Sequence, residues 1–348
     1  MNTPTKLTLF LALSISMGTS AAKNWVVSER ELPIPAGASG QLQQAIAEAG
    51  KPSVAARSFA PTSEKQWREL IAMRAVSSPL LLTELGASLN LSISRDEIAG
   101  VAVHQILPNK IKPQNKDRLF VYLHGGAYVF GGGDKSVREG ALIASMSKIP
   151  AVSIDYRMPP DHPSPAAVDD VVAVYRELLK THKPTAIAMG GTSAGGGLTL
   201  AVVHQIKSLG LPVPGALYLG TPWADLTTAS DSLHTNEGID RILVTHNGML
   251  GACAQLYAAG EDLHNPLISP VYGDFSGFPP TYLVTGTRDM LLSDTARVHR
   301  KLRVAGVVAD LNVYEGLSHA EYWMVTGSPE WQQTYEELAA FLLRHLAP

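Results

Sequence analysis

The chain has 348 residues, a formal net charge of −3, a hydrophobic fraction of 45% and a charged fraction of 17%. Length and apolar content together allow a sizeable buried core, which excludes an intrinsically disordered chain. The near-neutral balance, with no block of like charges, argues against nucleic acid or an anionic membrane as the partner.

The first 22 residues have the pattern of a signal peptide. Lys6 gives a positive start, residues 7–17 are mostly apolar but too short to cross a bilayer, and small residues at 20–22 precede an expected cut after Ala22. No later segment is long and apolar enough for a membrane helix. We therefore expect an exported protein, periplasmic or secreted, without stable membrane insertion once the signal is removed.

Residues 23–98 are expected to form an N-terminal arm followed by a helical cap. The arm, to about residue 40, is polar and interrupted by proline and glycine. From residue 42 to 89 the apolar side chains, among them Trp67 and Ile71, recur at three- and four-residue spacing. This spacing predicts two or three helices and no strand.

From residue 99 to 348, short apolar runs alternate with helical stretches. The alternation predicts an α/β fold with a mostly parallel central sheet flanked by helices. The expected strands are 101–107, 119–123, 151–154, 186–189, 216–219, 282–285 and 311–314, and the expected helices are 167–179, 196–208, 294–305 and 331–346. Residues 225–266 are too many for an ordinary connection, so we expect a cap or lid insertion there.

The main chemical signal is the run Gly191, Thr192, Ser193, Ala194, Gly195 between an expected strand and an expected helix. A serine on a sharp strand-to-helix turn, with glycine two residues away on either side, is typical of a nucleophile elbow. The turn strains the serine backbone, and larger side chains at the glycine positions would clash. We predict Ser193 as a nucleophile.

A serine nucleophile needs a base and an acid that orients it. His319 follows the strand expected at 311–314, and Asp289 follows the one at 282–285. The order nucleophile, acid, base along the chain is the one found on α/β-hydrolase sheets. Asp294 is the rival acid, but it better fits the N-cap of the helix that follows.

Main-chain N–H groups are expected to hold the negative oxygen of the reaction intermediate. Gly125, Gly126 and Ala127 directly follow the strand expected at 119–123, and the N–H of Ala194 opens the helix after Ser193. Three nearby aromatic residues are candidates for substrate binding, with core packing as the alternative: Tyr128, Trp223 and Tyr322.

From about Val101 onward the chain resembles the bacterial hormone-sensitive-lipase-like esterases, also called family IV, of the α/β-hydrolase fold. The matching segments are HGGAYVFG at 124–131, DYR at 155–157, HPSPAAVDD at 162–170, GGTSAGG at 190–196, GTRD at 286–289 and GLSH at 316–319. The resemblance implies a metal-independent carboxylesterase for short or medium acyl chains, with a helical cap and with Gly126, Ala127 and Ala194 as oxyanion donors. Two residues depart from the family pattern, because Ala127 replaces a usual glycine and Thr192 a common aspartate.

We predict a serine hydrolase that cleaves small-molecule carboxylic esters through an acyl-enzyme on Ser193. A lactonase or deacetylase, an amidase or peptidase on the same triad, and a non-catalytic ligand-binding member of the fold are the alternatives. No cofactor is expected, and no metal, because the histidines lack a ligand spacing such as His-Glu-x-x-His. A homodimer is left open.

Overall fold

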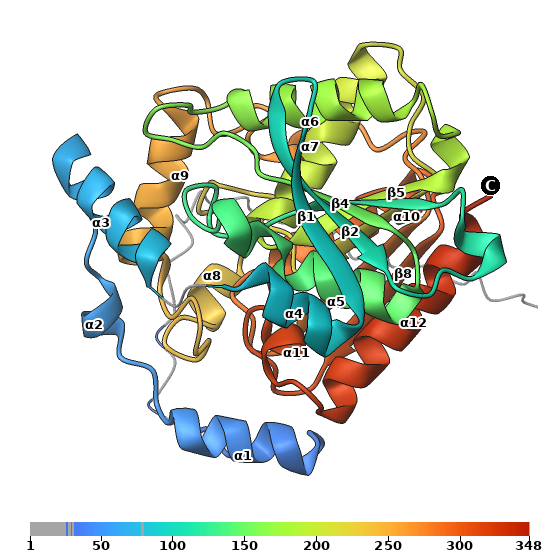
Figure 1. Ribbon diagram of the computed structural model, residues 1–348. Coiled ribbons are helices and arrows are strands. Elements are labelled where there is room, and N and C mark those ends of the chain that lie inside the picture. The colour runs from blue at the N-terminus through green and yellow to red at the C-terminus, as the bar shows by residue number, and fades with distance from the viewer. Residues whose placement is uncertain (1–25, 27–28, 30, 78–79, 348) are drawn as a thin grey trace, which may run out of the picture. The chain divides into compact units, whose positions relative to one another are not determined.

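An eight-stranded sheet forms the centre of the structure, in the order β1-β2-β4-β3-β5-β6-β7-β8 (Figure 1). The structure is a computed structural model and describes residues 26, 29, 31–77 and 80–347, so the expected signal peptide lies outside the described residues. The strands are β1 Leu91–Ile98, β2 Val101–Pro108, β3 Leu119–Leu123, β4 Ala151–Ile154, β5 Ile187–Thr192, β6 Ala216–Gly220, β7 Thr281–Gly286 and β8 Ala309–Tyr314. In this order, neighbouring strands from β4 to β8 are parallel, whereas β2 pairs antiparallel with both β1 and β4. The predicted α/β fold is confirmed.

Helices cover both faces of the sheet (Figure 1). The helices of the described residues, of which α1 to α3 lie away from the sheet, are α1 Gly40–Ala49, α2 Val54–Arg57, α3 Glu64–Val76, α4 Leu82–Leu89, α5 Arg138–Ser147, α6 Ala166–Leu178, α7 Ala194–Ser208, α8 Ser232–Thr235, α9 Gly251–Ala258, α10 Leu292–Val304, α11 Glu321–Met324 and α12 Pro329–His345. Alternate side chains of a strand point to opposite faces, so each central strand serves two cores. On β3, Phe120 and Tyr122 pack with α5 and α12, whereas Val121 and Leu123 pack with α6, α7 and α10.

The sheet begins earlier in the chain than expected. Residues 91–98, assigned by the sequence to the cap, form β1 and pair with β2 through a two-residue turn of Ala99 and Gly100, whose φ angles are 54° and 78°. Positive φ at both positions suits the tight hairpin turn that follows the strand twist. The predicted boundary between residues 98 and 99 is therefore wrong. Most β1 side chains are exposed, so this strand has no apolar run that could reveal it.

The N-terminal helices do not form a single layer. α4 contacts β1 and α5. Ser39, the N-cap of α1, donates its N–H and hydroxyl to Glu330 of α12 at 2.8 and 2.7 Å. Residues of α2 and α3 instead line the cavity described below. From Ile34 onward the chain forms one compact unit. Within the described part of the chain, no helix combines the length and apolarity that crossing a bilayer requires.

Candidate active site

The sharp turn between β5 and α7 carries Ser193 with φ 62° and ψ −123°. This conformation is strained for a side-chain-bearing residue, and it is fixed by a hydrogen bond from the N–H of Ser193 to the carbonyl of Gly220 at 2.8 Å. A Cβ on Gly191 or Gly195 would lie 1.9 or 2.0 Å from the carbonyl oxygen of Leu123. The two flanking glycines therefore allow the end of β3 to approach the turn.

Replacing Gly195 by alanine is expected to lower the free energy of unfolding by about 2 kcal/mol, because the added methyl group meets backbone and cannot be avoided by a side-chain rotation. In an open helix the same change is stabilising. Gly40→Ala is the matched control, since a Cβ on Gly40 meets nothing within 4 Å. Urea unfolding of both variants checks the prediction, and equal stability of Gly195→Ala and the unaltered protein contradicts it.

His319 and Asp289 meet beyond the ends of the last two strands. Nδ1 of the imidazole lies 3.2 Å from Oδ1 of Asp289, and both side chains are buried. The carboxylate of Asp289 also accepts hydrogen bonds from the N–H of Leu291 at 2.7 Å and from the hydroxyls of Thr285, at 3.1 Å, and Thr221. These hydrogen bonds fix the orientation of the carboxylate, with Oδ1 directed at the imidazole.

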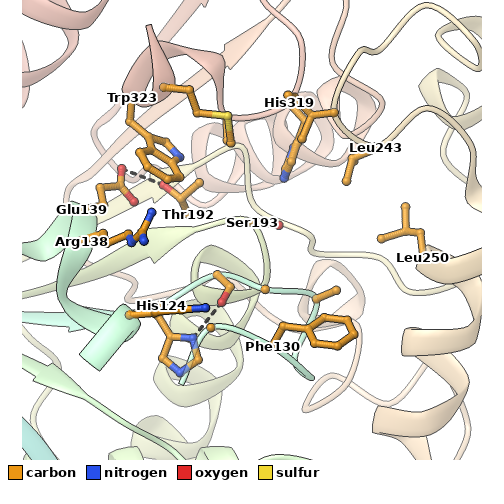
Figure 2. A pocket seen from close by; sticks show the side chains of 18 of the residues that line it. His124, Phe130, Arg138, Glu139, Thr192, Ser193, Leu243, Leu250, His319 and Trp323 are labelled. Atoms are coloured by element: carbon orange, nitrogen blue, oxygen red, sulfur yellow. Dashed lines mark hydrogen bonds between the residues drawn. The ribbon is translucent and has the colours of Figure 1, made fainter. Parts of the chain in front are cut away.

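The other side of the imidazole faces Ser193 across the cavity (Figure 2). No hydrogen bond between Ser193 Oγ and His319 is formed among the described residues. Such a contact is commonly long in an empty active site and tightens when substrate binds. The structure thus brings together the predicted nucleophile, base and acid, from the loops that follow β5, β8 and β7.

Asp294 has a different position from the one predicted. It lies inside the first turn of α10, whose N-cap is Leu291, so its expected capping role is wrong. Its buried carboxylate instead accepts the N–H groups of Ala224 and Asp225, each at 2.9 Å, and the hydroxyl of Ser230. Burial raises the pKa of Asp294 to about 7. The residue anchors the chain that follows β6.

Asp240 is a neighbour of the site that sequence reasoning missed. It comes from the insertion, and its carboxylate accepts the N–H of Met290 at 2.9 Å and that of His319 at 3.3 Å. Burial, and then the nearby charge of Asp289, raise the pKa of Asp240 to about 6. A single aspartate in a polar segment gives no pattern from which this contact could be inferred.

The loop after β3 presents main-chain N–H groups to the cavity. Gly125, Gly126 and Ala127 line it, with φ of 118° at Gly126 and 54° at Ala127. The N–H groups of Gly126, Ala127 and Ala194 have no acceptor among the described residues. Ala194 itself is fully buried at the start of α7. His124 braces the loop, because its ring stacks on Tyr156 at 4.1 Å and its Nδ1 lies 2.7 Å from the carbonyl oxygen of Gly125.

A buried carboxylate lies directly behind the nucleophile. Glu139 of α5 accepts hydroxyl hydrogen bonds from Tyr218 at 2.6 Å, Thr192 at 2.9 Å, Tyr122 at 3.0 Å and Tyr335 at 3.2 Å. Burial raises the pKa of Glu139, and the hydroxyl donors oppose that rise. Thr192, which replaces the family's common aspartate, thus has a defined partner. The only signal in the sequence for this cluster was that replacement.

The cavity itself has a volume of about 500 Å³. Its lining includes Phe130, Leu243, Leu250 and Trp323, which give it apolar walls on either side of Ser193 (Figure 2). Among the described residues, no group of three or more His, Cys, Asp or Glu side chains is placed to hold a metal ion.

The three predicted substrate-binding aromatics do not line this cavity, so that prediction is wrong. Tyr128 and Trp223 are buried beneath the elbow. The hydroxyl of Tyr128 donates to the backbone carbonyl of Trp223 at 3.1 Å, and the backbone N–H of Trp223 donates to the carbonyl of Ser193 at 2.9 Å. Tyr322 is buried too, with its hydroxyl 2.7 Å from that of Thr192. Its neighbour Trp323 faces the cavity instead, because the short helix α11 turns adjacent side chains in different directions.

Comparisons with known proteins agree with this geometry. The model of the alpha/beta hydrolase fold family matches residues 120–323. An acetyl-hydrolase of Streptomyces hygroscopicus is 32% identical over 234 residues, which cover 67% of this chain and 78% of that protein. The crystal structure of an esterase, E25, is 46% identical with a TM-score of 0.90, and the match covers 93% of this chain and 99% of that one.

A second solved structure bears on the subfamily. It is an esterase from the bacterial hormone-sensitive lipase family, 30% identical with a TM-score of 0.70, and the match covers 82% of this chain and 100% of that one. The chain belongs to the α/β-hydrolase family and, within it, to the hormone-sensitive-lipase-like esterases. The resemblance inferred from the motifs is thereby confirmed.

Proposed function

We propose that the protein is a carboxylesterase that works through an acyl-enzyme on Ser193. The observation that carries this proposal is that Ser193 and His319 line one cavity, with Asp289 hydrogen-bonded behind the imidazole. Main-chain N–H groups of the same lining have no acceptor among the described residues. The names of its relatives, an acetyl-hydrolase and esterases, support the same reaction.

The chemistry follows from the positions of these groups. Ser193 Oγ attacks the ester carbonyl while His319 takes its proton, and the N–H groups of Gly126, Ala127 and Ala194 hold the developing oxyanion. The alcohol leaves with the proton from His319, and the acyl group stays on the serine. Water, deprotonated by His319, then attacks the acyl-enzyme, and the carboxylic acid leaves as Ser193 regains its proton.

The size and lining of the cavity support a preference for short to medium acyl chains. α2 and α3 contribute to its wall, and so do residues 242–250 of the insertion. We therefore assign the cap function to α2, α3 and the insertion at 225–266, with α1 and α4 outside it.

Export belongs to the same proposal. The signal-peptide pattern of residues 1–22 supports a periplasmic or secreted enzyme. Cell fractionation, with N-terminal sequencing of the mature protein, tests this, and a retained Met1 contradicts it. Light scattering of the purified protein distinguishes a monomer from the homodimer that the sequence left open.

Hydrolysis of 4-nitrophenyl esters of rising acyl length, beside the matching 4-nitroanilides, tests the reaction class. We expect release from the esters, highest for short and medium chains, and little from the anilides. A fluorophosphonate probe should label Ser193, as peptide mass spectrometry would show. A folded protein that neither cleaves the esters nor reacts with the probe contradicts the proposal and favours a binding role. Faster release from the anilides favours an amidase.

The pH dependence follows from the surroundings of His319. Burial alone lowers its pKa, but the carboxylates of Asp289, Asp240 and Asp294 outweigh burial and raise the pKa above the ordinary value of 6.5. As the base, His319 must be neutral, so kcat/KM is expected to rise with pH through this raised value. A pH profile of the neutral ester checks the prediction. An acidic limb centred below 6.5 contradicts it.

A further inference from the structure

The cavity over Ser193 is unusually rich in cations. Arg57, Arg74, Lys135 and Arg138 line it, and Glu139 is its only acidic lining residue among those described. The carboxylate of Glu139 is already engaged by buried hydroxyls. Because the whole chain carries a net charge of −3, this concentration of positive charge is local and does not reflect the overall composition.

Arg74, in the last turn of α3, carries most of the argument. Its guanidinium lies 4.2 Å over the ring of Phe130, and no carboxylate or other acceptor within the described residues takes up its N–H groups. Burial, and the like charge of Arg57, lower the pKa of Arg74. A partly buried cation beside another cation, without an anion, is held at a cost in free energy that an anionic ligand would offset.

Arginines elsewhere in the described residues form ion pairs with carboxylates of the same chain. Arg68, only two turns before Arg74 on α3, lies 2.7 Å from Glu64 and 2.7 Å from Asp161. Arg157 lies 2.7 Å from Asp170. Arg57, like Arg74, has no such partner among the described residues, so two of the guanidinium groups that border the cavity are not paired with a carboxylate of this chain.

The end of α3 is also held in place by Lys135, another cation of the lining. The ammonium group of Lys135 donates hydrogen bonds to the carbonyls of Arg74 and Ser77. A cation at the carbonyl end of a helix is electrostatically favourable. The contact fixes the backbone of Arg74 relative to the oxyanion loop, so the guanidinium is positioned before any substrate arrives.

We propose that the cavity selects esters that carry a carboxylate, bound by Arg74 together with Arg57. A guanidinium fork matches the two oxygens of a carboxylate, and burial strengthens this contact more at Arg74, which is half-buried, than at Arg57, which is exposed. The carboxylate would lie on the Phe130 side of Ser193, across the site from Arg138 and Trp323 (Figure 2). This inference rests on the proposed esterase function and names the substrate class of that site.

Paired substrates of nearly equal size, one with a carboxylate and one without, test the inference. The acyl arm compares 4-nitrophenyl hydrogen adipate with 4-nitrophenyl hexanoate, and the alcohol arm compares 4-acetoxybenzoate with its methyl ester. We expect the ratio of kcat/KM, anionic over neutral, to exceed one in one arm, which identifies the half of the ester that carries the charge. Raising the salt concentration should lower this ratio, because screening weakens the attraction.

Substitutions of Arg74 and Arg57 test whether these residues cause the preference for anionic esters. Arg74→Gln is expected to lower the ratio about tenfold, as for one lost charge-assisted hydrogen bond, and Arg57→Gln to lower it less. Arg74→Lys, which keeps the charge, should retain part of it. Arg68→Gln is the matched control on the same helix, because it removes a cation that is already paired outside the cavity. A ratio near or below one in both arms, or an equal fall in Arg68→Gln and Arg74→Gln, overturns the inference.

The two proposals fail in different ways. If the protein cleaves 4-nitrophenyl hexanoate but shows no dependence of the ratio on Arg74, only the selectivity inference is lost. If none of the four esters is cleaved and Ser193 does not react with a fluorophosphonate, the esterase proposal itself is wrong.

Discussion

Replacing Ser193 by alanine is expected to lower kcat for ester hydrolysis by about 10⁶-fold, leaving only the rate due to substrate binding and the oxyanion donors. The side chain is small, lines the cavity and makes no hydrogen bond among the described residues, so the fold should be unaffected. Steady-state hydrolysis of a 4-nitrophenyl ester measures the loss. An unchanged urea-unfolding midpoint and the loss of fluorophosphonate labelling are the controls.

His319→Ala should cost about as much, because the hydroxyl is a weak nucleophile without its base. The two groups act as a unit, so the double variant is expected to be no slower than either single variant. Multiplicative losses in the double variant would mean that the residues act independently. A Ser193→Ala protein within tenfold of the unaltered activity would show that the acyl-enzyme forms elsewhere or not at all.

The central strands could be predicted closely from the sequence because burial on both faces makes each a continuous apolar run. Residues 119–123 and 151–154 were expected as strands and are β3 and β4 with the same bounds. The candidate site residues follow from this regularity. When parallel strands are located, the residues just beyond their carboxyl ends must meet at one edge of the sheet, so Ser193, Asp289 and His319 could be brought together by chain order alone.

Features that depend on side-chain direction or on partly exposed segments could not be predicted. β1 is an edge strand with mostly exposed side chains and therefore resembles a loop. Tyr322 and Trp323 are adjacent aromatics, and only the orientation of α11 decides which of them faces the cavity. The sequence shows that Arg74 and Arg68 are both positively charged. Which of the two is paired with a carboxylate depends on the three-dimensional packing and could not be predicted.

Asp289→Asn is expected to lower kcat by about 10²-fold, less than the loss of Ser193. Oδ1 of Asp289 accepts the backbone N–H of Leu291, which cannot turn away, whereas Oδ2 faces the hydroxyls of Thr221 and Thr285, which can rotate to accept. The asparagine should therefore keep its oxygen toward His319 and its NH₂ group toward the threonines. The imidazole then retains its productive tautomer, and what is lost is the negative charge that stabilises the imidazolium. Hydrogen bonds to charged groups are worth about 1.5–3 kcal/mol, and the upper end, which suits a buried carboxylate, corresponds to about this factor.

The pH profile of Asp289→Asn distinguishes Asp289 from the neighbouring aspartates as the acid of the triad. Removing the charge of Asp289 withdraws the largest influence that raises the pKa of His319, so the acidic limb of kcat/KM should move to lower pH. Asp294→Asn is the matched comparison: its oxygen can still accept the N–H groups of Ala224 and Asp225, and its NH₂ group can donate to Ser230, so kcat should fall less than tenfold. If Asp294→Asn is inactive while Asp289→Asn retains full activity, the acid is Asp294. The contacts of the two carboxylates argue for the opposite result, because Asp289 is hydrogen-bonded to the imidazole while Asp294 holds the chain after β6.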